Sequence, residues 1–351
     1  MNLGYVEPTY AYPHMIGHRS SLATGLFNGC LQEPAIKFHF FNSTVVQSFG
    51  YRPSLKITPR DGSSEYTVES DIILAADGIK SKTRVELLKI LGVEASVQDT
   101  NQAAYRIMIN REQILDDPEL LELMDGNRIT RWIGEKRHII AYPISNNTIY
   151  NMSTTQPDTN FAGATNATYT TRGSKSAMLG VFSDFCPKIQ RLLNLVPDGE
   201  VCEWKLRVHE PIPTWVLNSV ALVGDACHPT LPHMAQGAAQ AIEDAAVIGV
   251  VLSRLPDTRP GSINKALGVY ETIRKGRAET LVELAAIAGR SMHLGEGKEK
   301  EERDRQFEAL RKNGSGPVPD RWADADIQRM VYGTDCAQIA HETFDAHFGP
   351  V

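Results

Sequence analysis

The chain has 351 residues, enough for two domains with a substantial hydrophobic core. Its formal net charge of −6 and the lack of a basic stripe argue against a nucleic-acid partner. Five scattered cysteines without a C-x-x-C pair, no signal-peptide pattern and no apolar run long enough for a bilayer favour a soluble cytoplasmic protein over a disulfide scaffold or a membrane protein.

The first hundred residues alternate short strand patterns with turn signals. Asp61-Gly62, between two apolar segments, indicates a hairpin. Ile72–Ala76 is predicted to be a buried strand that ends in the acidic turn Asp77-Gly78, and the apolar spacing predicts a helix from Lys80 to Leu91. The other strands expected here are Ile36–Phe41, Thr44–Phe49, Leu55–Thr58 and Tyr66–Val68.

A second group of strands is expected to form a separate sheet. Its members are Ala103–Ile109, Ile129–Ile133, His138–Ile144, Thr148–Ser153 and the crossing strand Trp204–His209. A polar loop, Asn160–Lys175, and a helix from Met178 to Leu195, broken near Pro187, lie between these strands. Helices are then predicted over Ala238–Leu255, Ser262–Leu294 and the charged segment Gly295–Arg311.

This order of elements predicts a mixed α/β fold. Strands joined by helices, then a separate sheet, then a return to the first pattern indicate a discontinuous, Rossmann-like nucleotide-binding domain with an insertion. The expected domains are residues 1–97 with 208–295, an inserted β-sheet domain at 98–207, and a helical C-terminal tail at 296–351.

The segment from Val220 to Ala246 carries the strongest functional pattern. A short apolar strand, Val220–Val223, ends in Gly224-Asp225, and ligands of open α/β sheets bind beyond such strand ends. The carboxylate of Asp225 suits a sugar hydroxyl. Gly237 and Ala238 let a flat ligand approach the backbone, and the helix that follows offers free N–H groups to negative charge.

This segment, G-D-A-C-H-P-x-x-P-x-x-x-Q-G ending in E-D-A, resembles the second flavin motif of the FAD-dependent aromatic-ring monooxygenases of the salicylate and para-hydroxybenzoate hydroxylase type. Cys227 replaces the usual alanine. Asp77 to Arg84 matches the D-G-x-x-S-x-x-R motif of the same family. The alternative interpretation is a Gly-Asp turn before an ordinary core helix.

The resemblance assigns cofactor contacts to particular residues. It implies that Asp225, Gly237 and Ala238 bind FAD, and that Arg19, at a helix start, contacts its pyrophosphate. A surface salt bridge is the alternative role for Arg19. Asp77 is either part of the cofactor motif or only a turn and helix cap.

The resemblance also suggests a catalytic pair. Arg106 and Tyr142, on strands of the inserted sheet, match the arginine and tyrosine that activate substrate in the fungal secondary-metabolism branch of the family. A guanidinium and a phenol facing one cavity can hold a phenolate. The alternatives are an interdomain ion pair and a buried core tyrosine.

Two other groups of residues are not expected to be catalytic. His228 and His233 lie close to Asp225, but the prolines between them stiffen the loop and no further ligand follows, so no metal site is expected. Glu243 and Asp244 are adjacent on a helix and point about 100° apart, so we expect packing or capping rather than one acid–base site.

The G-x-G-x-x-G turn of dinucleotide-binding folds does not occur in this sequence. The first βαβ unit of the family is therefore expected to be missing, through a truncated gene model, a fragment or a genuinely shortened protein. Because that turn binds the pyrophosphate, the 351-residue chain is expected to bind FAD poorly.

The activity that the resemblance implies is hydroxylation of an aromatic, phenolic or polyketide-type small molecule with FAD, NAD(P)H and O₂, within secondary metabolite biosynthesis. Related enzymes epoxidise alkenes, so the reaction and the substrate stay open, as do the choice of NADH or NADPH and the oligomeric state. The alternative is a flavin-free remnant with a binding role or no activity.

Overall fold

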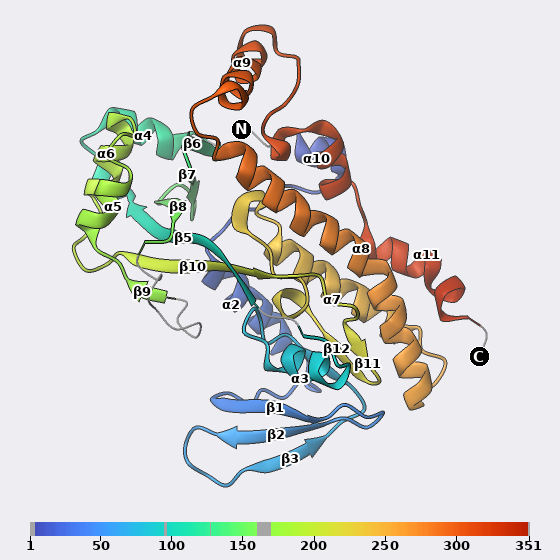
Figure 1. The fold of residues 1–351 in the computed structure, drawn as a ribbon. Helices are drawn as coiled ribbons and strands as arrows, with labels where there is room; N and C mark the ends of the chain where they lie inside the picture. Colours follow the sequence, from blue (N-terminus) through green and yellow to red (C-terminus); the bar gives the residue numbers. More distant parts are fainter. Residues whose placement is uncertain (1–3, 95–96, 127, 160–169, 350–351) are drawn as a thin grey trace. The chain divides into compact units, whose positions relative to one another are not determined.

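The computed structural model describes residues 4–94, 97–126, 128–159 and 170–349. The chain divides into two compact units (Figure 1). Unit 1 comprises Met1–Lys37, Asp99–Leu206 and Ala288–Gly333, and unit 2 comprises Phe38–Gln98, Arg207–Ile287 and Thr334–Val351. The three domains expected from the sequence stay a prediction.

Unit 1 is built on a six-stranded sheet of order β6-β7-β8-β5-β10-β9. The pairings of β5 with β8, of β8 with β7 and of β7 with β6 are antiparallel, as is that of β10 with β9. The strands are β5 (Val97–Asn110), β6 (Thr130–Gly134), β7 (Arg137–Ile144), β8 (Ile149–Pro157), β9 (Thr170–Arg172) and β10 (Cys202–His209).

One face of this sheet packs against helices to form the core of unit 1. The core contains alternate strand residues such as Ile107, Ile139 and Met152, together with Leu120 and Leu192 from the helices. The helices of this core are α4 (Pro118–Asp125), α5 (Lys175–Val181) and α6 (Pro187–Asn194), with the short turn η1 (Arg111–Ile114). The predicted break near Pro187 is confirmed, because this proline begins α6.

The remaining elements of unit 1 are peripheral helices. They are α1 (Val6–Tyr10), α2 (Arg19–Cys30), α9 (Lys298–Asn313), η4 (Arg321–Ala323) and α10 (Ala325–Tyr332). The predicted charged helix is thus present as α9. The polar loop expected at Asn160–Lys175 lies in part outside the described residues.

Unit 2 contains two three-stranded sheets. The hairpin sheet β1-β2-β3 is antiparallel, and in the sheet β11-β12-β4 the pair β12–β4 is parallel. The strands are β1 (Asn42–Ser48), β2 (Ser54–Pro59), β3 (Tyr66–Glu69), β4 (Ile73–Ala75), β11 (Val216–Leu217) and β12 (Val220–Leu222).

Helices cover the parallel pair of unit 2. They are α3 (Lys82–Ile90), α7 (Gly237–Ser253), α8 (Pro260–Met292) and α11 (Cys336–Phe348), with the short turns η2 (Gly224–Ala226) and η3 (Pro232–Met234). Figure 1 shows α7 and α8 side by side. The core of unit 2 joins Val220, Leu222, Val247, Leu267 and Tyr270 in one cluster, which explains the uninterrupted apolar character of β12.

The fold class predicted from the sequence, mixed α/β, is confirmed, and one expected strand is wrong. Ile36–Phe41 forms no strand, and regular pairing begins at Asn42, opposite Pro59 of β2. Phe41 has φ +60°, outside the strand region, and its carbonyl oxygen accepts from the amide of Arg60 at 3.0 Å, so the backbone turns just before the strand begins. Within the described ranges, no helix combines the length and apolar character that crossing a bilayer requires.

Candidate functional site

The carboxyl end of β12 opens into the loop that the sequence marks as a ligand site. The three residues of β12 are fully buried, whereas Asp225, in the turn η2, is exposed. Gly224 has φ +62°, and a Cβ there would lie 3.1 Å from the Cβ of Ala241 on α7. Only glycine combines this backbone with so close a neighbour, so the turn lies directly against α7.

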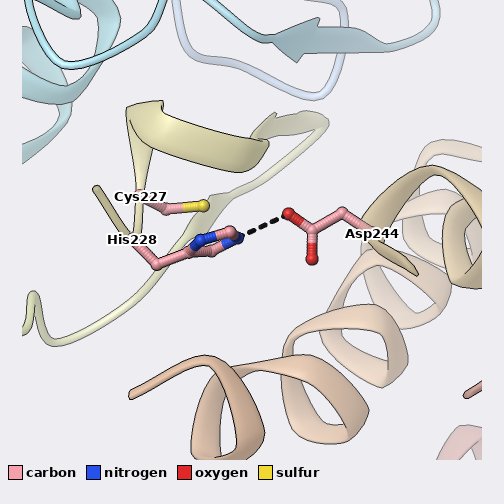
Figure 2. Close-up of side chains that lie close together, drawn as sticks. All are labelled: Cys227, His228 and Asp244. Carbon is pink, nitrogen blue, oxygen red and sulfur yellow. Dashed lines mark hydrogen bonds and ion pairs between the residues drawn. The ribbon is translucent and has the colours of Figure 1, made fainter. Parts of the chain in front are cut away.

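Asp244 on α7 is the buried centre of the hydrogen bonds around this loop (Figure 2). Its Oδ2 accepts from the amide of Gly224 at 2.9 Å and from Nε2 of His228 at 2.6 Å, and its Oδ1 accepts from Nε of Arg274 at 2.9 Å. Burial raises the pKa of Asp244, but these three partners outweigh burial and hold the pKa below its usual value. Asp244 is therefore an ionised anchor of the loop.

The neighbouring carboxylate, Glu243, makes different contacts. Its Oε2 accepts from Nη1 of Arg274 at 2.5 Å and from Nε of Arg277 at 2.8 Å. Arg274 also donates to Oε1 of Gln240 at 2.7 Å, and its side chain is fully buried. Glu243 and Asp244 thus bind different nitrogen atoms of the same Arg274 side chain, and α7 and α8 are joined by a charged network inside the core. The packing or capping expected from the sequence did not include this shared ion pair.

Cys227, His228 and Asp244 form the one group found in the described residues whose side chains lie close enough for a metal ion, within 4.8 Å of one another. One feature argues against a metal. The charge of Asp244 is already balanced by Arg274 at 2.9 Å. Burial raises the pKa of the Cys227 thiol well above its usual value. His233 is not part of the group, and the absence of a metal stays a prediction.

The start of α7 has the properties that a diphosphate or a ring system requires. Its N-cap residue, Gln236, makes no side-chain capping bond, so the first amides of this 17-residue helix are free of a side-chain acceptor. Ala238 is exposed, and a Cβ on Gly237 would lie 3.2 Å from Cγ2 of Thr230. The turn η2, with Asp225, packs against the same helix.

Arg84 holds the loop from the second motif segment, the one that begins at Asp77. The residue is 3% exposed, and its guanidinium donates to the carbonyl oxygens of Ala226 at 2.9 Å and Ile79 at 2.6 Å. The carboxylate of Asp77 accepts from the hydroxyl groups of Ser81 and Thr83 and from the amide of Thr83. Asp77 thus binds the first turn of α3 beside its N-cap residue Ser81, and its role in the cofactor motif stays a prediction.

Arg106 and Tyr142 project from the same face of the unit 1 sheet. Their neighbours Ile107, Ile139 and Ala141 point into the helix-packed core, so by alternation Arg106 and Tyr142 lie on the opposite face. Burial raises the pKa of the Tyr142 phenol, and the nearby charge of Arg106 acts in the opposite direction. Arg106 is exposed and forms no ion pair with the described residues of unit 1.

Arg19 is the first residue of α2 and is exposed. Among the described residues of unit 1 it has no ion-pair partner. The helix is capped by the side chain of His18, which accepts from the amide of Ser20 at 3.3 Å. Arg19 lies in unit 1 and Asp225 lies in unit 2. The structure of each unit by itself therefore does not test whether the two residues bind the same cofactor.

No family model matches the chain. The FAD-dependent monooxygenase ntnJ of Nectria sp is 35% identical over 276 residues, which are 78% of this chain and 62% of that protein. Over about four fifths of its own length, the chain is therefore similar to FAD-dependent monooxygenases. It spans about three fifths of the length of that relative, and likewise of atnJ from Arthrinium sp, at 63%.

One solved structure has a similar fold. The salicylate hydroxylase substrate complex superimposes with a TM-score of 0.73 and 24% sequence identity, over 92% of this chain and 74% of that chain. This likeness supports the mixed α/β fold expected for the family.

FAD fits the residues of unit 2. An exposed carboxylate at a strand end, an uncapped helix start and small residues around it are the donor and acceptor types that a ribitol, a diphosphate and a flat ring require. The specific roles of Arg19, Asp225, Gly237, Ala238, Arg106 and Tyr142 stay predictions.

Two arginines hold the loop: Arg84, which the sequence placed in a motif without a stated role, and Arg274, which it did not single out. A signal for Arg274 was available, because it follows Tyr270 by four residues and Leu267 by seven, and so lies on the apolar face of α8. A charged residue on a buried helix face implies a buried partner.

Replacing Arg84 by methionine is expected to destabilise unit 2 by about 1–3 kcal/mol, because buried carbonyl groups of Ala226 and Ile79 lose their donor. The measurement is urea unfolding followed by fluorescence. Lys82, exposed on the same helix, is the control, and its change to methionine is expected to have almost no effect. Equal stability of the two variants would contradict the role of Arg84.

Proposed function

We propose that this chain is the FAD- and NAD(P)H-dependent part of a monooxygenase that hydroxylates a phenolic or polyketide-type aromatic compound in secondary metabolism. The observation that carries the proposal is the arrangement at the end of β12, where exposed Asp225 and the uncapped start of α7 lie together on a loop anchored by Asp244. Similarity to ntnJ and to the 3-hydroxybenzoate 6-hydroxylase 2 of Aquipseudomonas alcaligenes, at 28% identity over 81% of each chain, supports the reaction class.

In unit 2, the residues of the loop would bind the cofactor. The carboxylate of Asp225 accepts hydrogen bonds from sugar-type hydroxyl groups, and the free amides at Gly237 and Ala238 face negative charge. Arg19 of unit 1 is proposed to neutralise diphosphate charge. The chemistry that FAD supplies when bound is two-electron reduction by NAD(P)H and activation of O₂.

In unit 1, Arg106 and Tyr142 would bind the substrate. Arg106 stabilises the phenolate form, which raises the electron density of the ring, and the hydroxyl group of Tyr142 orients the same oxygen. One atom of O₂ becomes the new hydroxyl oxygen and the other becomes water. NAD(P)H supplies the two electrons that this balance requires.

The test is incorporation of oxygen from ¹⁸O₂. Purified protein is incubated with FAD, with NADH or NADPH and with a panel of phenols, and the products are analysed by mass spectrometry. One ¹⁸O atom per product supports the proposal. Bound flavin without phenol-dependent NAD(P)H oxidation contradicts it. Because this chain is expected to bind FAD poorly, FAD is supplied in excess. Protein that takes up no flavin even then contradicts the proposal and supports the flavin-free alternative.

Changing Asp225 to alanine is expected to weaken FAD binding by about one to two decades, because a charge-assisted hydrogen bond of roughly 1.5–3 kcal/mol is lost. The measurement is fluorescence titration with FAD. The matched control is Asp71→Ala, since Asp71 is also exposed but precedes the amino end of β4 rather than following the carboxyl end of β12. Equal affinity of the Asp225 variant and the parent would remove Asp225 from the cofactor site.

A further inference from the structure

A groove of about 790 Å³ opens at one edge of the unit 1 sheet, between the edge strand β6 and the helices α4 and α6. Figure 1 shows α4 and α6 close together beside β6. On β6, Trp132 lies opposite Ile139, which belongs to the helix-packed core, so Trp132 faces the helices. Arg106 and Tyr142 lie on the opposite face of the sheet, and this α4–α6 groove is therefore separate from the proposed substrate residues.

The wall of the groove at the start of α6 is held by the β6–β7 hairpin. Phe185 packs against Gly134, where an added Cβ would lie 3.0 Å from the Phe185 ring. Arg137 donates to Asp184 at 2.5 Å, and its guanidinium lies 5.6 Å from the centre of the Phe185 ring. The next residue, Cys186, is exposed and lines the groove. This wall is thus built on a segment with its own contacts to the sheet.

The floor of the α4–α6 groove is apolar. Leu123 and Ile129 are buried beneath it, and the ring of Trp132 is half-buried. An indole ring beside aliphatic side chains suits the flat, apolar body of a ligand. The volume of the groove falls in the range of small-molecule sites, about 300–1,000 Å³, so its occupant is a small molecule.

The charged side chains of the groove leave cations available for a ligand. Among the described residues that line it, Glu119 is the one carboxylate, and Arg191 binds it. The side chain of Lys188 forms no ion pair with the described residues. Arg128 pairs with Glu122 at 2.9 Å, but these side chains are 47% and 67% exposed, so water screens the pair. The groove therefore complements a negative charge.

We propose that the α4–α6 groove binds a small organic anion with a flat, apolar body. The negative group is held by Lys188 and Arg128, because both side chains only donate and both carry positive charge. The apolar body lies on Trp132. This site is an addition to the proposed function and does not rest on it, since the groove and the residues Arg106 and Tyr142 lie on opposite sides of the sheet.

The test measures how far a ligand protects Cys186 from alkylation by N-ethylmaleimide. Folded protein is alkylated in the presence of 2-naphthoate, or of 2-naphthamide, which has the same shape without the charge, and each cysteine peptide is followed by mass spectrometry. Cys30 lies in unit 1 outside the groove and is the internal control. The variants are Lys188→Met, Lys188→Glu and the matched control Lys312→Met, an exposed lysine of α9. Circular dichroism of each variant verifies the fold.

Saturating 2-naphthoate is expected to slow alkylation of Cys186 at least about fivefold and that of Cys30 less than about twofold, since a bound ligand covers the walls of its own site. Lys188→Met is expected to weaken 2-naphthoate about tenfold, and Lys188→Glu further, because a charge-assisted hydrogen bond is lost. 2-Naphthamide is expected to bind weakly and equally in all variants. Lys312→Met is expected to stay within about twofold of the parent. Rates with and without ligand are compared within each variant, so that a change in the thiol's own reactivity cancels.

Three results would overturn the proposal. The first is a folded parent protein in which 2-naphthoate leaves the alkylation of Cys186 unchanged. The second is equal protection by 2-naphthoate and 2-naphthamide without any effect of Lys188, which is the behaviour of an apolar surface that does not select anions. The third is equal slowing at Cys30, which indicates general shielding. Protection that the Lys188 variants weaken and Lys312→Met preserves supports the site.

Discussion

Replacing Arg274 by methionine is expected to lower the free energy of unfolding of unit 2 by about 3–5 kcal/mol, the cost of removing one partner from a buried ion pair. The side chains of Arg274 and Asp244 are both completely buried, and Arg274 is also bound to Glu243 and Gln240. Methionine fills much of the same volume, so the loss comes from the uncompensated charge of Asp244 rather than from a cavity. Urea unfolding measured by the fluorescence of Trp215, which is buried in unit 2, reports the change.

The next residue of the same helix provides a matched control. Lys275 pairs with Glu279 at 2.9 Å, but their side chains are 25% and 31% exposed. Lys275→Met is expected to change stability by less than about 1 kcal/mol, because an exposed i,i+4 pair contributes little. Similar losses in the two variants would show that the network around Asp244 does not stabilise the fold as described.

Changing Arg106 to alanine or Tyr142 to phenylalanine is expected to uncouple oxygen transfer from NAD(P)H oxidation, in the protein that passes the ¹⁸O test. Each variant loses one charge-assisted or oriented hydrogen bond to the reacting oxygen, worth roughly 1.5–3 kcal/mol, so product per NAD(P)H is expected to fall about tenfold to hundredfold. Neither residue belongs to the loop at the end of β12, so NAD(P)H oxidation without substrate is expected to persist, with hydrogen peroxide in place of product.

The matched control is Arg172→Ala, which removes an exposed arginine from β9 at the edge of the same sheet. Product and hydrogen peroxide are measured in parallel for all three variants. The Arg106 and Tyr142 variants could both give the same product yield as the parent and the control. That result would remove the pair from the catalytic residues. The interdomain ion pair and packed tyrosine would then be the remaining roles.

Local sequence patterns determined the elements on which the site is built. The apolar run at Val220, the glycine at 224 and the small residues after Gly237 predict a buried strand, a tight turn and a helix start, and each is present within a residue or two. These predictions succeed because each depends on the conformational preference and burial of neighbouring residues. The strand expected at Ile36–Phe41 fails because the backbone turns at Phe41 just before pairing begins, which an alternating pattern does not specify.

The sequence by itself determined the α/β class, the strand-loop-helix order at Asp225 and the resemblance to the FAD-dependent monooxygenases, since these are properties of contiguous segments. Only the tertiary structure decided that Asp244 is an anchor bound to Arg274, 30 residues away along the chain, and that Arg106 and Tyr142, on different strands, share one face of the unit 1 sheet. Those contacts depend on helix packing and strand register, which bring distant residues together and which local periodicity does not specify.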